Sequence, residues 1–338
     1  RKHMNIPPAQ VKLIEKITEV NKNCVVILTN GAPITMPWLT KVDSVIEAYL
    51  LGRAGATAVK NILLGKVNPS GKLAETFPKR VEDTPSYLDL PGLNHNLSYG
   101  EGIFVGYRWY EKRDIEPLFP FGFGLSYTTF EYNNLKVSKE NFTDKDTLEV
   151  SLDITNSGDV KGKEVVQLYV KDIESRLIRP VKELKAFEKI ELLPGETKNI
   201  TFTLNTRDFS YFDDWFSSWI AESGDFEIMV GSSSKEIRLT KMVNLTAQQN
   251  VKVPFTKKST LREWLMFKES KEVILDVVKN YFEPMKDQYE GDIHDLNIKN
   301  DFFLDLPMQK FIYLSRGAVS EKLLEDALKK ASKLHIKL

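Results

Sequence analysis

Side chains that could do chemistry gather in one stretch of the sequence, Tyr99–Phe130. Glu101 offers a carboxylate there, and a carboxylate can act as a general acid, a general base or a nucleophile. Two aromatic rings and a guanidinium follow within a few residues, and such groups suit the rings and hydroxyl groups of a sugar. The candidate ligand-binding residues are therefore Glu101, Tyr107, Arg108 and Trp109.

Each of these residues also has a purely structural interpretation. Glu101 lies between two glycines, where capping a backbone turn is the favoured explanation. In an extended segment, Tyr107 and Trp109 would share one face and pack into the core. Other chemistries fit less well. The glycines nearby lack the spacing of a dinucleotide fingerprint, and the 4 histidines are too scattered in the sequence to make a metal site.

The sequence before this stretch predicts an α/β domain. Helical spacing of apolar residues indicates helices at Pro8–Val20 and Gly55–Leu64, each with a buried apolar face. Continuous apolar runs predict strands at Cys24–Leu28 and Ser44–Leu50, and Lys72–Phe77 is predicted to be a third, short strand. Alternating helices and strands imply crossover connections, and therefore a mostly parallel sheet covered by helices.

After Phe130 the apolar residues recur with a period of two, which indicates half-buried strands. The alternating segments are Leu148–Ile154, Val166–Val170, Ile200–Leu204 and Phe226–Val230. Turn residues such as those of Leu193–Glu196 separate them. This pattern predicts an all-β sandwich of about a hundred residues.

The last part of the sequence, residues 246–338, has a third character. Residues 246–260 are polar and predict a linker. Helical spacing returns at Leu261–Phe282 and Leu304–Leu314, and Ser320 is a good N-cap for a final helix. We expect a small helical appendage here.

The composition sets limits on partners and location. With 338 residues the chain can form two or three domains. Its net charge is zero, which argues against nucleic acid or an anionic membrane as the main partner. The single Cys24 cannot form an internal disulfide, which suits the cytoplasm. No run is apolar enough for a membrane span, no cofactor is predicted, and Arg1–Met4 does not resemble a natural start.

Four motifs, in order, resemble the carboxyl-terminal half of the glycoside hydrolases of family 3, the β-glucosidase and β-xylosidase type. They are Val25–Trp38, Asn68–Pro78, Glu101–Tyr110 and Phe121–Thr128. The strands that follow, as far as Ala221–Gly224, resemble the fibronectin type III-like domain of that family. This resemblance implies an α/β domain at residues 1–127 and a sandwich at residues 128–245, and residues 246–338 resemble a tail of some bacterial members.

The resemblance implies a retaining, exo-acting β-glycosidase that hydrolyses terminal β-linked sugars. In the family the nucleophilic Asp lies on a preceding (β/α)₈ barrel, and the acid/base Glu lies on a loop of the α/β domain. Because Arg1 matches the arginine of that loop, both carboxylates are expected upstream of Arg1. The chain would then be an inactive fragment or one part of a split enzyme, with a barrel domain and an oligosaccharide or β-glucoside as partners.

The resemblance also suggests where the barrel would contact this chain. In the family the active site lies in the crevice between barrel and α/β domain, and loops at the carboxyl ends of parallel strands form such crevices. Met36 and Trp38 follow the strand Cys24–Leu28, so we expect them to be exposed as interface residues. The alternative function is a non-catalytic sugar-binding or structural docking module. The sequence leaves open the sugar, the linkage and the oligomeric state.

Overall fold

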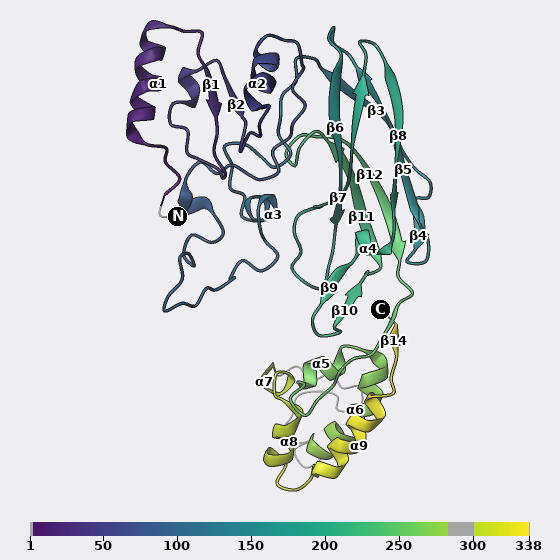
Figure 1. Cartoon of the computed structure of the whole chain (residues 1–338). Helices are drawn as coiled ribbons and strands as arrows, with labels where there is room; N and C mark the ends of the chain where they lie inside the picture. Colours follow the sequence, from purple (N-terminus) through teal and green to yellow (C-terminus); the bar gives the residue numbers. More distant parts are fainter. Residues whose placement is uncertain (1–2, 283–300, 338) are drawn as a thin grey trace. The chain divides into compact units, whose positions relative to one another are not determined.

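Figure 1 shows the computed structural model of the chain, which describes residues 3–282 and 301–337. The chain forms two compact units. The first unit comprises residues 1–142, 146–209 and 224–245, and the second comprises residues 143–145, 210–223 and 246–338. An α/β region followed by a β-sandwich makes up the first unit, and a hairpin with a group of helices makes up the second.

The α/β region begins with helix α1 (Pro8–Val20), strand β1 (Val25–Leu28), strand β2 (Ser44–Glu47) and helix α2 (Gly55–Leu63). Strands β1 and β2 pair in parallel along their whole length (Figure 1). This confirms the helix and the parallel strands that the apolar pattern predicted. Short 3₁₀ turns occur at Leu39–Lys41 and Val81–Asp83.

Two predictions for this region are wrong. Lys72–Phe77 is not a strand, because the backbone N–H groups of Leu73 and Phe77 donate to the carbonyls of Phe123 and Phe119 instead of to β1 or β2. Helix α2 does not bury its apolar face either, since only Gly55 within it is buried. A two-stranded sheet is too narrow to cover a second helix.

The sandwich of the first unit consists of antiparallel strands in two sheets. The five-stranded sheet has the order β4-β12-β11-β6-β7, and the three-stranded sheet has the order β3-β5-β8. The bounds are β3 (Phe130–Val137), β4 (Asn141–Thr143), β5 (Leu148–Asn156), β6 (Gly162–Asp172), β7 (Glu183–Leu192), β8 (Thr197–Leu204), β11 (Gly224–Gly231) and β12 (Ile237–Thr246), with the single turn α4 (Thr206–Phe209) after β8.

Apolar residues at alternate positions of the strands fill the core of this sandwich. On β5 the alternate residues Leu148, Val150, Leu152 and Ile154 have no exposed surface. Burial of each such side chain stabilises the fold by roughly 1.5–3 kcal/mol. The prediction of an antiparallel sandwich is therefore confirmed.

The second unit holds the hairpin β9 (Tyr211–Asp213) and β10 (Ser218–Ile220), the pair β13 (Asn250–Val251) and β14 (Ile336–Lys337), and a helical group. The helices are α5 (Leu261–Leu265), α6 (Lys268–Phe282), α7 (Asp301–Leu304), α8 (Met308–Leu314) and α9 (Glu321–Ala331). Ser320 caps α9 as predicted, because its Oγ accepts the N–H of Leu323 at 3.2 Å.

Two further predictions need correction in this unit. The stretch 261–282 is two helices rather than one, with the break between Leu265 and Lys268. Residues 246–260 are more than a linker, since Val251 and Val253 are buried in a cluster with Tyr211, Phe216 and other apolar residues. Strand pairing of β13 with β14 ties this segment to the end of the chain.

Candidate functional site

The candidate residues Tyr107, Arg108 and Trp109 lie on a helix, α3 (Tyr107–Lys112), and not on an extended segment (Figure 1). Gly106 precedes the helix with φ +56°, a conformation that glycine adopts without steric cost. The helix ends after one and a half turns at Arg113. The alternation expected of a strand is therefore wrong, and the three side chains point in different directions around a helix.

Tyr107 packs where the α/β region meets the sandwich. Its hydroxyl accepts the N–H of Leu184 at 2.8 Å, and its ring stacks on Phe121 with 5.1 Å between centroids. The ring also packs edge-to-face with Tyr169, with 5.9 Å between the two centroids. Burial raises the pKa of Tyr107 above its ordinary value. These contacts use the whole side chain for packing.

Arg108 forms an ion pair with Glu183, with 3.1 Å between Nη2 and Oε1. Burial by itself raises the pKa of Glu183, but Lys185, Arg108 and Arg179 outweigh burial and hold that pKa below its usual value. Glu183 is therefore ionised, and Arg108 is committed to joining α3 to β7.

Trp109 donates its indole N–H to the carbonyl of Asp83 at 3.0 Å. The guanidinium of Arg113 lies over the indole ring, 5.3 Å from its centroid. Both the polar atom and one face of Trp109 therefore have partners within the α/β region.

Glu101 differs from the other three candidates. Its carboxyl Oε2 is buried and accepts no hydrogen bond from the described residues. The turn around it is closed by backbone bonds, from Gly102 N–H to the Tyr99 carbonyl and from Phe104 N–H to the Glu101 carbonyl. The side chain therefore does not cap this turn within the described part of the chain.

The structure contradicts the expected exposure of Met36 and Trp38. Trp38 has no exposed surface, and Met36 is 7% exposed. Both belong to a buried cluster with Leu28, Ile34 and Phe77, against which Val11 and Ile14 of α1 also pack. The loop after β1 turns back and fills the space beside the narrow sheet, because this is the nearest place where the indole can leave water.

Charged pairs hold the same junction between the α/β region and the sandwich. Nζ of Lys182 lies 2.6 Å from Oε1 of Glu111, and only 8% and 6% of the two side chains are exposed. Lys72 and Glu164 make a second pair at 3.0 Å. Neither pair could be predicted from the sequence, because the partners are far apart in the chain and only Glu164 lies within an apolar strand pattern.

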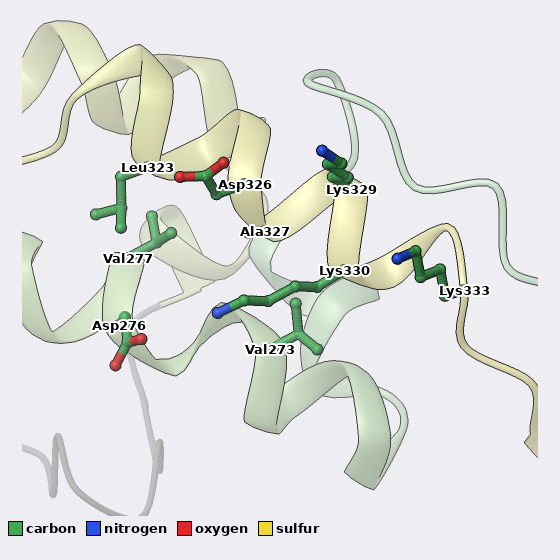
Figure 2. Close-up of a pocket in the computed structure, with 9 residues that line it drawn as sticks. All are labelled: Val273, Asp276, Val277, Leu323, Asp326, Ala327, Lys329, Lys330 and Lys333. Carbon is green, nitrogen blue, oxygen red and sulfur yellow. The ribbon is translucent and has the colours of Figure 1, made fainter.

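Two cavities among the described residues do not fit a sugar beside Tyr107, Arg108 and Trp109. One of about 370 Å³ lies between α6 and α9 in the second unit (Figure 2). Its lining has an aliphatic floor and charged ends but no aromatic ring: Val273, Asp276, Val277, Leu323, Asp326, Ala327, Lys329, Lys330 and Lys333. The gap beside Tyr107 and Glu111 does not admit a water molecule.

Metal-binding clusters and membrane-spanning helices are both absent from residues 3–282 and 301–337. No group of three or more His, Cys, Asp and Glu side chains there could hold a metal ion. No helix within the same ranges has the length and apolar character that crossing a membrane requires.

Comparison with protein families gives two matches. The model of the glycosyl hydrolase family 3 C-terminal domain matches residues 1–127, and the model of the fibronectin type III-like domain matches residues 164–234. Both lie in the first unit or overlap it, and they follow the order that the motifs predicted.

Similar full-length proteins are glycosidases. A thermostable β-glucosidase B from Acetivibrio thermocellus is 44% identical over 98% of this chain and 43% of its own length. An exo-α-(1→6)-L-arabinopyranosidase from Bifidobacterium breve is 40% identical over 78% of this chain and 34% of its own. The chain therefore spans less than half the length of either relative.

Solved structures show the same relation. The crystal structure of a family 3 β-glucosidase from Bifidobacterium adolescentis superposes with a TM-score of 0.73 and 38% identity, covering 81% of this chain and 40% of that one. A β-glucosidase from Kluyveromyces marxianus in complex with glucose gives a TM-score of 0.69 at the same identity.

Proposed function

The chain belongs to glycoside hydrolase family 3, and from this premise we propose that it supplies the C-terminal domains of a retaining, exo-acting β-glycosidase. The observation that carries the proposal is the match to a β-glucosidase over 98% of this chain at 44% identity. Its substrate would be a terminal β-linked sugar of an oligosaccharide or a β-glucoside.

The proposed mechanism needs two carboxylates. One attacks the anomeric carbon and displaces the leaving group, while the other protonates the leaving oxygen and later activates a water molecule. We assign neither role to a described residue. Tyr107, Arg108 and Trp109 are occupied by packing, an ion pair and a backbone hydrogen bond, and the Oε2 atom of Glu101 is buried without a hydrogen-bond partner among the described residues.

We therefore propose that the nucleophilic Asp belongs to a (β/α)₈ barrel that works with this chain, and that the acid/base Glu lies just upstream of Arg1. Arg1 itself lies outside the described residues. Contacts near this end support the second assignment. Thr35, in the loop after β1, donates its backbone N–H to the Met4 carbonyl at 3.0 Å and its hydroxyl to Asn5 Oδ1 at 2.7 Å. Residues 4 and 5 are therefore held against the loop that follows β1.

Three finer assignments are also proposals. We place the domain boundaries at residues 127/128 and 245/246, on either side of the alternating strands. We propose a cytoplasmic location, which the free, buried Cys24 supports. We propose glucose or xylose as the sugar, although the arabinopyranosidase relative shows that relatives of this chain differ in their substrates.

The test is an assay of residues 1–338 alone and together with a separately expressed family 3 barrel that carries the acid/base loop. Nitrophenyl β-glucoside, β-xyloside and α-L-arabinopyranoside are the substrates. We expect no hydrolysis above background by the chain alone, because two missing carboxylates cost many orders of magnitude. The reassembled pair should hydrolyse one of the three.

Two outcomes would contradict the proposal. Hydrolysis by the chain alone that Glu101→Gln abolishes would show that the acid/base is Glu101. A complex that forms but hydrolyses none of the substrates would favour the non-catalytic docking module.

A further inference from the structure

A half-buried carboxylate lies where the parallel strands β1 and β2 end. Glu47 is the last residue of β2, and Asn30 follows β1 by two residues. Because the strands are parallel and in register, with Leu28 opposite Glu47, their carboxyl ends meet at the same edge (Figure 1). In open α/β sheets, ligands bind outside this edge.

Two N–H groups hold the Glu47 carboxylate in place. The side-chain amide of Asn30 donates to Oε2 at 3.2 Å, and the backbone N–H of Tyr49 donates to Oε1 at 2.9 Å. Asn30 is fixed in turn, since its amide also donates to the Ala32 carbonyl at 2.9 Å. A carboxylate offers about four acceptor positions, so each oxygen of Glu47 can accept another hydrogen bond.

The backbone at Tyr49 is strained in the conformation that makes this contact. Tyr49 has φ +48°, which is an outlier for a bulky residue. Strain of this kind persists where the surrounding structure enforces it, and it gathers at ligand-binding positions. Here it aims the Tyr49 N–H at Glu47.

Glu47 has no cationic partner among the described residues, because no lysine or arginine there pairs with it. Burial is the largest cause that raises its pKa, and the nearby carboxylate of Glu75 adds to the rise. Asn30 Oδ1 is buried and accepts no hydrogen bond within the same residues. The hydroxyl of Tyr49 is likewise buried without a hydrogen-bond partner among these residues. A ligand that carries hydroxyl groups, which both donate and accept, would match this edge.

The surroundings of Glu47 fit a sugar better than a free cation. Leu50 and Leu51, just beyond Tyr49 in the sequence, are 82% and 42% exposed, and apolar side chains of this kind suit the C–H face of a pyranose ring. The loop after β1, which begins at this edge, is hydrogen-bonded to Met4 and Asn5.

We propose that Glu47 binds two adjacent hydroxyl groups of the saccharide on the leaving-group side, with Asn30 and Tyr49 as positioning residues. The inference rests on the proposed function for the identity of the ligand. Each sugar hydroxyl would donate to one carboxylate oxygen, which sets a preference for a leaving group with two neighbouring equatorial hydroxyls.

The experiment is a titration of the ¹⁵N-labelled 338-residue chain with cellobiose, followed through the amide signals of Ala48 and Tyr49. Cyclohexanol, with a ring of the same size and one hydroxyl, is the matched probe. We expect saturable shifts with cellobiose and none with cyclohexanol. Glu47→Gln and Glu47→Asp should each weaken binding by about five-fold or more, since each disturbs one charge-assisted pair.

Glu188→Gln is the control variant, because Glu188 is exposed on β7 of the sandwich. It should bind cellobiose as the wild type does. The same spectra show whether each variant is folded, so a loss of binding can be separated from a loss of structure.

Three results would overturn the inference: no shift at Tyr49 up to the solubility limit of cellobiose, equal affinity of wild type and Glu47→Gln, or shifts of these amides by CaCl₂ and not by cellobiose. None of these depends on turnover. Hydrolysis by the reassembled enzyme, with no binding at Glu47, would therefore reject the subsite and keep the proposed function.

Discussion

Trp38 shows how one side chain can organise a small region. The indole has no exposed surface and contacts the cluster formed by Leu28, Ile34, Met36 and Phe77. Its ring N–H is buried and has no hydrogen-bond partner among the described residues. The packing must therefore compensate for an unsatisfied donor, which makes the cluster dependent on the ring itself.

We expect Trp38→Ala to destabilise the first unit by about 3–5 kcal/mol, because a large cavity replaces a buried ring. The measurement is urea unfolding followed by circular dichroism. Val20→Ala is the control, since Val20 is 87% exposed on α1, and it should change the free energy of unfolding by less than about 0.5 kcal/mol. Equal stability of Trp38→Ala and wild type would contradict the burial described here.

Burial of the charged Lys182–Glu111 pair costs free energy, and removal of one partner also destabilises the protein. Burial raises the pKa of Glu111 and lowers that of Lys182, while each partner partly offsets the effect for the other. The second oxygen of Glu111 has no partner among the described residues. Removing one member would leave an uncompensated buried charge.

We expect Lys182→Met to destabilise the protein by about 3 kcal/mol at pH 8 and by less at pH 5. Without Lys182 the pKa of Glu111 rises further above its unfolded value. A raised acid pKa gives stability that is complete below the unfolded pKa and is lost as the pH rises through the folded pKa. Lys235 and Lys171 also act on this pair, but they remain in the variant.

Urea unfolding at pH 5, 6.5 and 8 measures this dependence. The double variant Glu111→Leu, Lys182→Met should recover most of the lost stability at all three values, because no buried charge remains. If Lys182→Met lowers the free energy of unfolding by the same amount at all three pH values, the buried charge of Glu111 does not cause the loss of stability.

At the scale of elements, the glycine-rich stretch serves as a junction between the α/β region and the sandwich. Gly124 passes so close to Gly71 that a Cβ added at Gly124 would lie 2.2 Å from the Gly71 carbonyl oxygen. Asn68 joins these segments to the sandwich, since its Oδ1 accepts from Ser126 Oγ and its side-chain amide donates to the Lys161 carbonyl at 3.1 Å. The motifs Asn68–Pro78 and Phe121–Thr128 therefore contact each other in the folded chain.

We expect Gly124→Ala to cost about 1–3 kcal/mol, because the new methyl group meets backbone that must shift. Gly71→Ala is the matched control. A Cβ at Gly71 would have no atom within 4 Å, so that substitution should be neutral or slightly stabilising. Thermal unfolding of both variants checks the difference, and equal melting temperatures would contradict the close approach.

At the scale of the whole molecule, α1 carries more apolar surface than residues 3–282 and 301–337 cover. Leu13, Ile17 and Val20 are exposed and form a stripe at helical spacing, while Val11 and Ile14 pack inward. A helix that is apolar on both faces is usually buried in a larger structure. If the chain works with a barrel domain, as proposed above, we expect this stripe to contact that domain, because Met36 and Trp38 are buried.

The substitutions Leu13→Lys and Val20→Lys should each weaken association with a separately expressed family 3 barrel by about ten-fold or more. Ile178→Lys is the control, because the exposed fraction of Ile178, 74%, lies between those of Leu13 and Val20, and Ile178 lies on the loop between β6 and β7. Calorimetric titration of the barrel into each chain measures the affinity. Unchanged affinity of the α1 variants would place the contact elsewhere.

Local patterns determined much of this protein in advance. Helix α1, the parallel strands β1 and β2, the alternating strands of the sandwich and the Ser320 cap all follow from short-range rules of period and capping. The family also follows from the sequence, because four ordered motifs carry it.

Only the tertiary structure decided which apolar and polar groups became core or surface. Trp38 is buried, Val20 is exposed, and the backbone of Lys72–Phe77 bonds to the Phe119–Phe123 segment instead of to a sheet. Each outcome depends on which distant segment arrives to cover or to pair with a residue. Period and spacing describe one segment at a time, so they cannot specify contacts such as that of Asn30 with Glu47, 17 positions apart.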